Sequence, residues 1–356
     1  MNDKPPTQRR PSPLAHPGVM AGLAAAALFG AGTPFAKLLL GTIDPWLLAG
    51  LLYLGSGIGL TLWRLLRRAP AVSLPADQRL WLAGAVLAGG VAGPVLLMFG
   101  LSGMPASGAS LLLNAEGVFT ALLAWFAFKE NFDRRILLGM LAIVAGAVVL
   151  SWPGDARWGD AWPALAVLGA CLAWAVDNNL TRKVALNDAS WIAAVKGLAA
   201  GSVNLGLAAL AGAAWPALPW VGGAMLLGLA AYGISLTLFV VALRHLGTAR
   251  TGAYFSVAPF FGALLAVGWL GEPVTGPLLL AGLLMAWGVW LHVTERHGHE
   301  HKHEAIEHAH EHVHDVHHQH AHEGSAADAP HTHRHRHETL PHAHEHFPNA
   351  HHQHRH

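Results

Sequence analysis

Apolar residues dominate the chain from Gly18 to Leu291 and almost vanish after His292. Within this region they form blocks of about twenty residues, the length at which an α-helix crosses the hydrocarbon core of a bilayer. Short breaks of Pro, Gly or charged residues separate the blocks. The pattern predicts ten transmembrane helices, at about 18–41, 45–63, 79–101, 106–128, 134–152, 162–181, 191–214, 219–243, 248–270 and 274–293.

Composition separates this chain from ordinary soluble domains. Of its 356 residues, 53% are hydrophobic and only 12% are charged, whereas soluble domains carry about 25% charged residues. A soluble protein with buried helices would need surface helices with one charged face, and the stretch from Leu80 to Phe128 contains none. Arg9 and Arg10 before an apolar run resemble a signal peptide, but the run extends to about Leu40, too long for a cleaved signal core.

Lys and Arg residues are distributed unevenly between the predicted loops. With the N-terminus in the cytoplasm, the cytoplasmic segments hold nearly all of them, and the opposite loops hold Arg157, with Lys37 near a helix end. The positive-inside rule expects this asymmetry, and an even number of helices returns the C-terminus to the cytoplasm. We expect an integral protein of a bacterial cytoplasmic (inner) membrane with both termini in the cytoplasm.

The second half of the chain repeats the first. Residues 106–150 match residues 249–293 almost without gaps, and Phe29-Gly30 matches Trp174-Ala175. Each predicted unit has five helices, an odd number, so the two copies must cross the membrane in opposite directions. Such inverted repeats allow alternating access to a site near the middle of the membrane.

Both repeats contain motifs that carry a resemblance to a known family. A small-residue segment precedes an apolar helix that ends in Phe-x-Phe-Lys-Glu (126–130) or Trp-Leu-Gly-Glu (269–272), and a final helix with Gly follows. In these motifs the chain resembles the EamA domain of the drug/metabolite transporter superfamily. The resemblance spans about residues 18–293 and occurs twice. The resemblance implies a ten-helix, inverted-repeat exporter or exchanger of small metabolites, and it leaves the substrate open.

The expected fold is an all-α membrane protein of ten transmembrane helices in two inverted five-helix repeats, followed by a disordered tail. Its parts are a cytoplasmic N-terminal segment (1–17), a first repeat (18–152), an extracytoplasmic linker (153–161), a second repeat (162–293) and a His-rich cytoplasmic tail (294–356).

Ionisable side chains inside the membrane are candidates for function, because each costs about 2.5–3.5 kcal/mol on insertion scales. Glu116 lies in the middle of the fourth predicted helix, where the resemblance implies Pro, as at the matching Pro259. Asp177, Asn178 and Asn179 lie in the sixth predicted helix. Since consecutive helical residues are about 100° apart, at least one of these three must face the bundle or water.

A single Lys, Lys196, lies inside the seventh predicted helix and requires a counter-ion, which Glu116 or Asp177 could supply. Two interpretations stay open. The pair is either a static bridge that fixes helix packing, or a site where Lys196 attracts an anionic group while the carboxylate exchanges a proton. Asn114 and Tyr254 are further candidates for contact with substrate, and interhelical hydrogen bonding is the alternative for Asn114. No catalytic residue is expected.

The tail is rich in His, with 24 of the 26 His of the chain between residues 292 and 356. Its low-complexity, nearly apolar-free composition predicts disorder. Imidazoles at this density bind Zn, Ni, Co or Cu, although no fixed coordination geometry follows from the sequence, and pH buffering or a passive solvated tail is the alternative. The candidate ligands are His299, His301, His303, His308, His310, His312, His314, His331, His333, His335 and His337.

We expect a secondary transporter that exports a small metabolite, requires no cofactor and carries a metal-binding tail. A Zn, Ni or Co transporter and a membrane metal sensor that moves no solute are the alternatives. An enzyme is disfavoured, because the nearest metalloprotease-like string spaces His303 and His308 five residues apart instead of four. Expected partners are the lipid bilayer, a small-molecule solute and divalent metal ions, without nucleic acid, and a homodimer is left open.

Overall fold

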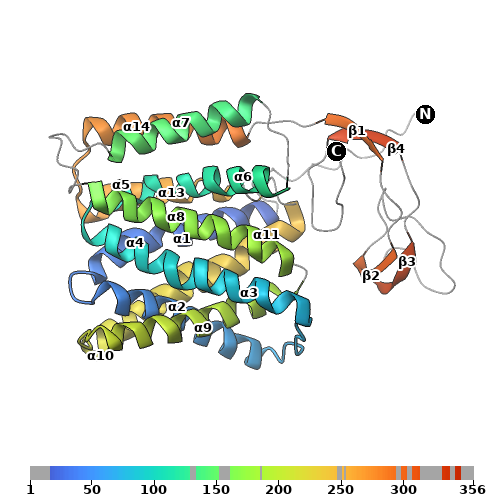
Figure 1. The fold of residues 1–356 in the computed structure, drawn as a ribbon, viewed down its shortest axis with the longest axis horizontal. Helices are drawn as coiled ribbons and strands as arrows, with labels where there is room; N and C mark the ends of the chain where they lie inside the picture. Colours follow the sequence, from blue (N-terminus) through green and yellow to red (C-terminus); the bar gives the residue numbers. More distant parts are fainter. Residues whose placement is uncertain are drawn as a thin grey trace, which may run out of the picture. The chain divides into compact units, whose positions relative to one another are not determined.

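The structure is a computed structural model that describes residues 17–128, 134–151, 161–184, 187–246, 251, 254–293, 298–302, 307–312, 331–336 and 341–345. The chain divides into two compact units, Met1–Glu295 and Arg296–His356, and each is described by itself. The described residues of the first unit form a bundle of helices (Figure 1).

The helices of the first half are α1 (Pro17–Leu39), α2 (Pro45–Leu66), α3 (Arg79–Ala85), η3 (Val86–Ala92), α4 (Gly93–Ser102), α5 (Ala106–Leu112), α6 (Ala115–Phe128) and α7 (Arg134–Ser151). Those of the second half are α8 (Trp162–Thr181), α9 (Ala189–Leu210), α10 (Leu218–Gly228), η6 (Leu229–Ile234), α11 (Ser235–Leu246), α13 (Ala258–Leu270) and α14 (Gly276–Val293). Short 3₁₀ turns, η2 (Ala76–Gln78) and η5 (Arg182–Val184), precede α3 and follow α8.

Seven helices in the described part of the chain are long and apolar enough to cross a membrane, by length and composition. Three shorter apolar helices accompany them, at Leu137–Ser151, Ala258–Leu270 and Gly276–Leu291. The structure therefore agrees with a helical protein that crosses the membrane several times, and the count of ten spans stays a prediction.

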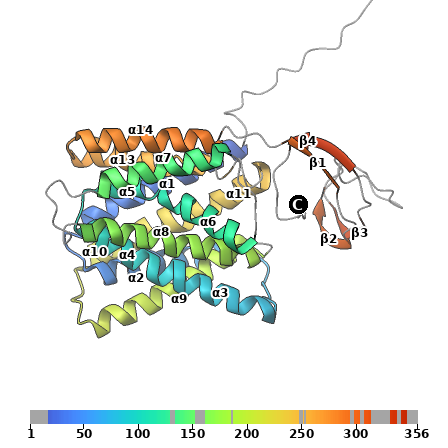
Figure 2. The ribbon, with the colours of Figure 1, turned by 45° about the horizontal axis from the view of Figure 1, so that its top comes forward.

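Helices that correspond in the two sequence repeats pack against each other. The match of Pro45-Trp46 with Ser190-Trp191 makes α2 the counterpart of α9, and the match of Gly139 with Gly282 does the same for α7 and α14. Both pairs lie side by side in the bundle (Figures 1 and 2). The helix α5 of the first half also packs on α13 of the second half. This arrangement fits two units related by a pseudo-two-fold axis.

The fourth predicted helix is broken, which corrects the prediction of one continuous helix over 106–128. The chain leaves the helix at Leu113 and Asn114 and resumes with α6, so that Glu116 is the second residue of a half-helix instead of the middle of a long one. A turn at Ser256 and Val257 likewise precedes α13, whose second residue is Pro259. The two breaks fall at matching positions, 143 residues apart.

The helices on either side of η3 and η6 also match between the repeats. Each forms one long apolar span with a π-helical segment inside it, and these segments begin at Val86 and Leu229, again 143 residues apart. In a π-helical segment the backbone hydrogen bonds span five residues instead of four, and such segments are frequent at functional sites.

Glycines bring α2 and α9 into backbone contact. A Cβ at Gly197 would lie 2.6 Å from the amide nitrogen of Gly57 and 2.8 Å from the Tyr53 carbonyl oxygen. Gly55 and Gly89 also lie in close contacts, since a Cβ at Gly55 would collide with Met225 and a Cβ at Gly89 with Asp177. Small residues therefore fix the helix spacing at the repeat interface.

The described part of the second unit contains four short strands. β1 (Gly298–Lys302) pairs with β4 (Pro341–Glu345), and β2 (Glu307–His312) pairs with β3 (His331–Arg336), both antiparallel. This differs from the prediction of a tail without regular structure. The reason lies in the His-x-His pattern, whose two-residue period suits a strand even though the composition provides no apolar core.

We predict that Gly197→Ala destabilises the fold, because the new methyl group must push α2 away from α9. Overpacking of this kind typically costs about 1–3 kcal/mol, so the apparent melting temperature of the purified protein in detergent should fall. Gly206→Ala on the same helix is the matched control, since a Cβ there would meet nothing within 4 Å. Equal melting temperatures for the two variants would contradict the close contact.

Candidate functional site

A buried ion pair joins α8 to α9. Lys196 Nζ lies 2.5 Å from Asp177 Oδ1 and 2.6 Å from Asp177 Oδ2. The Thr181 hydroxyl, one turn further along α8, donates to Asp177 Oδ1 at 2.8 Å. The side chains of Lys196 and Asp177 are only 12% and 10% exposed. Of the two counter-ions expected for Lys196, the structure therefore provides Asp177.

The π-helical segment η3 lies against this ion pair and carries two carbonyl groups that its own helix does not satisfy. Pro94 has no N–H to donate to the Gly90 carbonyl four residues earlier. The Gly93 N–H, which would reach Gly89 in a regular α-helix, bonds to Ala88 instead. In a bilayer such unsatisfied carbonyls are costly, so other groups must donate to them.

Three side chains from neighbouring helices supply the missing donors. Tyr53 Oη on α2 and Trp174 Nε1 on α8 donate to the Gly89 carbonyl oxygen at 2.8 and 2.9 Å. Asn204 Nδ2 on α9 donates to the Gly90 carbonyl oxygen at 3.0 Å. Tyr53 and Trp174 were not among the predicted site residues. Pro94, directly after Gly93 in a Gly-rich stretch, is the signal that could have indicated them.

Glu116 lies one helix away from the ion pair and has a different partner. Its Oε1 accepts a hydrogen bond from Asn178 Nδ2 at 2.8 Å, and the same amide lies 3.4 Å from the Thr120 hydroxyl. Because Glu116 is in the first turn of α6, the helix dipole favours its negative charge. Glu116 and Asp177 are thus connected through successive residues of α8, Asp177 being buried and Asn178 exposed.

The remaining predicted residues lie outside this cluster. Asn179 Nδ2 donates to the Ala175 carbonyl at 2.9 Å, within its own helix, and lies 3.4 Å from the Thr120 carbonyl. Asn114 is buried and donates at 3.0 Å to the Leu111 carbonyl beside the helix break. Tyr254 packs next to Gly22 of α1, where a Cβ would lie 3.4 Å from the Tyr254 Cβ.

Aromatic rings from both repeats meet beside the polar cluster. The centroid of the Phe29 ring in α1 lies 6.4 Å from that of Trp174 and 5.9 Å from that of Tyr232, both in edge-on geometry. The centroid of the Phe255 ring lies 5.3 Å from that of Phe29. The Tyr53 and Tyr232 rings lie 5.3 Å apart. Phe29 and Trp174 are matching residues of the two repeats, so their contact places this cluster at the interface between the repeats.

One end of the bundle is held together by a carboxylate and an ammonium group. Glu272, before α14, accepts hydrogen bonds from the N–H groups of Ala106 and Ser107 at 2.7 and 2.8 Å, at the start of α5. Lys37, near the end of α1, donates to the carbonyls of Leu101 and Met104 at 2.6 and 2.9 Å, around the end of α4. We call these contacts the Glu272 clamp. They use charged groups to satisfy helix termini, and they link the two repeats.

The opposite end of the bundle has its own connection between the repeats. Arg64, in the last turn of α2, lies 2.8 Å from Asp188 and donates to the Ser190 hydroxyl at 2.6 Å, at the start of α9. Partial burial alone would raise the pKa of Asp188, but hydrogen bonds from Ser190, the Trp191 N–H and Arg64 outweigh this effect. The pKa therefore lies below its ordinary value, and Asp188 stays ionised.

Metal ligands are not grouped among the side chains that the structure describes. No set of three or more His, Cys, Asp or Glu residues there is arranged to hold a metal ion. Of the predicted ligands in the tail, His303, His314 and His337 lie outside the described residues, and the others lie in the strands.

These features define the class of the protein. It is an α-helical integral membrane protein with a buried polar site at the interface of two matching halves, as in membrane transporters. A family model, described as the EamA-like transporter family, matches residues 16–152 and again residues 161–294. The chain belongs to this family, and the predicted membership is confirmed.

Two relatives carry transporter names. A protein of Methanothermobacter thermautotrophicus called "uncharacterized transporter" is 30% identical over 214 residues, which cover 56% of this chain and 60% of that protein. The match thus spans less than two thirds of the archaeal relative. The "uncharacterized inner membrane transporter YedA" of Escherichia coli K12 is 25% identical over 258 residues, covering 69% of this chain and 83% of that protein.

A solved crystal structure shares the fold. It superposes with a TM-score of 0.60 at 20% sequence identity, covering 77% of this chain and 94% of the other. At this identity the likeness concerns the fold alone.

We predict that the Asp177 and Lys196 substitutions are strongly coupled in stability. Asp177→Asn or Lys196→Gln alone leaves one buried charge without its partner, and breaking such a pair typically costs about 3–5 kcal/mol. The double variant leaves two neutral amides that can bond to each other, so its melting temperature should lie above those of both single variants. Additive losses in the double variant would show that the two charges do not interact.

Proposed function

We propose that this protein is a secondary transporter that exports a small polar metabolite by alternating access, and that it is not an enzyme. The main support for this proposal is the buried ion pair between Asp177 and Lys196, with Glu116 close by. Aromatic rings from the two repeats meet next to this pair. A solute held there would touch both repeats, and a change in their relative arrangement would move the opening from one side to the other.

The cluster offers a polar solute both charges and neutral hydrogen-bonding groups. Lys196 can pair with an anionic group of the solute if Asp177 gives up its bond, and Glu116 can accept from a donor if Asn178 moves aside. Either carboxylate can also take up a proton when its partner leaves, because an unpaired charge in the membrane is costly. Competition between solute and internal partners is thus a route to coupling transport to protons.

The same charges make a divalent metal a weaker candidate for cargo. The ammonium of Lys196 contacts both oxygens of Asp177 and would repel a cation at this carboxylate. The neighbouring side chains are amides and hydroxyls, whereas transition metals prefer imidazole and thiolate ligands. Metal binding is therefore assigned to the tail, with its many imidazoles, and not to the transport path.

The membrane arrangement in this proposal is ten spans in two inverted repeats, 18–152 and 162–293, with both termini in the cytoplasm. The Lys and Arg distribution supports the orientation. The name of the Escherichia coli relative supports a bacterial inner membrane. With this orientation the Glu272 clamp lies on the extracytoplasmic side and the Arg64–Asp188 pair on the cytoplasmic side.

We predict that Glu116→Gln abolishes transport while the protein still folds, because the amide keeps the size of the side chain but cannot bind a proton or a cation. Proteoliposomes would be incubated with a uniformly ¹³C-labelled cell extract, and accumulated compounds identified by mass spectrometry. The wild type should accumulate at least one compound above the level in empty liposomes, and Glu116→Gln should stay at that level.

Asp77→Asn is the control for this experiment, since Asp77 is an exposed carboxylate in the short η2 turn, away from the cluster. It should transport like the wild type. Full transport by Glu116→Gln would reduce Glu116 to a packing residue. A parallel uptake assay with ⁶⁵Zn tests the alternative cargo, and zinc flux that survives removal of residues 295–356 would overturn the metabolite proposal.

We also predict that Glu272→Gln loosens the extracytoplasmic end, because the carboxylate that binds two N–H groups is lost. Ser110, 1% exposed on α5, becomes a reporter as Ser110→Cys in a Cys171→Ser background. Its labelling in intact cells by a membrane-impermeant maleimide should become about tenfold faster. This factor corresponds to the free energy of one hydrogen bond to a charged group, which would no longer oppose opening. Asp44→Asn, the same chemical change at the start of α2, should leave the labelling rate unchanged. No difference between these variants would exclude the clamp as a gate.

A further inference from the structure

The pairing register of the tail strands places His opposite His. In the β1–β4 ladder, His299 lies opposite His344 and His301 opposite His342. In an antiparallel ladder, opposite residues share a face, and residues two apart along a strand share it too. The four His positions of this ladder therefore belong to one face. His342 and His344 were not among the predicted ligands, although the string His-Ala-His contains the same alternation.

The second ladder has the same register property. Its opposed pairs are His308 with His335, His310 with His333, and His312 with His331. The opposite face carries Glu307 opposite Arg336, a favourable pair of unlike charges. A shift of one residue would place every His opposite a residue of another kind, so the alignment of His with His is lost in any register displaced by one residue.

We propose that each of these His faces is a binding site for one divalent transition-metal ion, shared between two strands, and that the bound ion stabilises the strand pairing. This inference rests on the proposed metal-binding function of the tail and adds the ligands. The ligand set of each site is two neighbouring cross-strand His pairs. In β1–β4 these are His299, His301, His342 and His344.

The spacing of the register positions suits a four-ligand site. Opposite Cβ atoms in an antiparallel pair are about 4.5–5.5 Å apart, and alternate residues along a strand about 6.5–7 Å. A rectangle of four such positions brings together four His residues, and four nitrogen or sulfur ligands are the usual number in structural Zn²⁺ sites. The β2–β3 ladder has three opposed His pairs, so two neighbouring pairs form one such rectangle and one pair remains outside it.

Metal binding also explains how such polar strands can pair. An isolated two-stranded ribbon is marginal in water, and these strands have almost no apolar side chains to pack. A ligand that binds only the paired form shifts the equilibrium towards it. The β2–β3 ladder is nested in sequence between β1 and β4, so closing it first shortens the loop that β1–β4 must close.

Paired substitutions in the full-length protein test this inference, with Zn²⁺ binding measured by calorimetry in detergent and Co²⁺ absorption reporting the geometry. His299→Ala/His301→Ala and His342→Ala/His344→Ala should each remove the same single tight site. Removal of a residue that only hydrogen-bonds to a metal ligand typically weakens metal binding by tenfold or more. Removal of two ligands should therefore weaken Zn²⁺ binding by roughly tenfold at least. The quadruple variant should lose no further tight site, because both pairs belong to one site.

His352→Ala/His354→Ala is the matched control, since it removes the same His-x-His string from a part of the tail outside the ladders. It should leave the tight sites intact. A different outcome is that each of the three double variants removes a separate site and the quadruple variant loses two. Each His-x-His segment would then bind metal by itself, and the proposal of a site shared between two strands would be wrong. The metal-binding function of the tail would still stand. If the wild type binds no Zn²⁺, both proposals fall, and transport by the helical unit is unaffected.

Discussion

A carbonyl group inside a bilayer must find a donor, and Pro94 deprives this protein of one where its central site lies. The π-helical shape of η3 redirects the Gly93 N–H to Ala88, so two successive carbonyls depend on side chains of other helices. Tyr53, Trp174 and Asn204 provide the donors from α2, α8 and α9. Three helices therefore pack against one short segment, and Gly89 leaves room for Asp177 beside the backbone.

The two repeats build this interface with unequal chemistry. Phe29 and Trp174 correspond in sequence, yet only the indole has an N–H to give to Gly89. Glu116 and Pro259 occupy matching places behind matching helix breaks, yet only one can carry a charge. Symmetry thus sets the positions of the helices, and the departures from symmetry place the polar groups on one side of the pseudo-axis. A site with a defined polarity can arise in this way from a duplicated unit.

Sequence reasoning found the helices and the charged residues because each leaves a local signal. Twenty apolar residues predict a span, and Lys196 in such a span requires a counter-ion. The choice of Asp177 over Glu116 depends on how α8 is rotated against α9, which no periodicity in one helix can determine. The helix break at Leu113 and the π-helical segments were also missed, because they depend on hydrogen bonds exchanged with neighbouring helices. In the sequence, Tyr53 and Trp174 look like ordinary residues of apolar helices. Their role as donors becomes visible only when the structure places η3 beside them.

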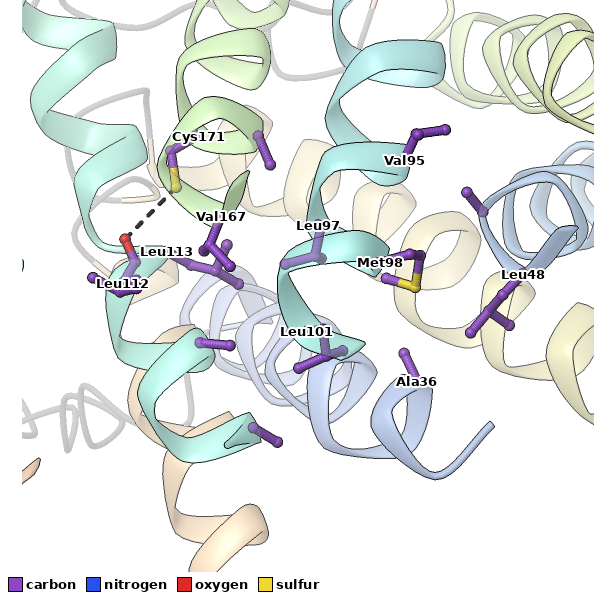
Figure 3. Close-up of a cluster of buried hydrophobic side chains, with 14 of the residues drawn as sticks. Ala36, Leu48, Val95, Leu97, Met98, Leu101, Leu112, Leu113, Val167 and Cys171 are labelled. Atoms are coloured by element: carbon purple, nitrogen blue, oxygen red, sulfur yellow. Dashed lines mark hydrogen bonds between the residues drawn. The ribbon is translucent and has the colours of Figure 1, made fainter. Parts of the chain in front are cut away.

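The break between α5 and α6 has a consequence for the only cysteine. The Glu116 N–H bonds to the Leu113 carbonyl, which frees the Leu112 carbonyl that a regular helix would occupy. The Cys171 thiol of α8 donates to that oxygen at 3.6 Å (Figure 3). If α5 and α6 straightened into one helix, Leu112 would regain a backbone donor and the thiol would lose its acceptor. The S–H stretching vibration of one buried residue therefore records whether this helix is bent or straight.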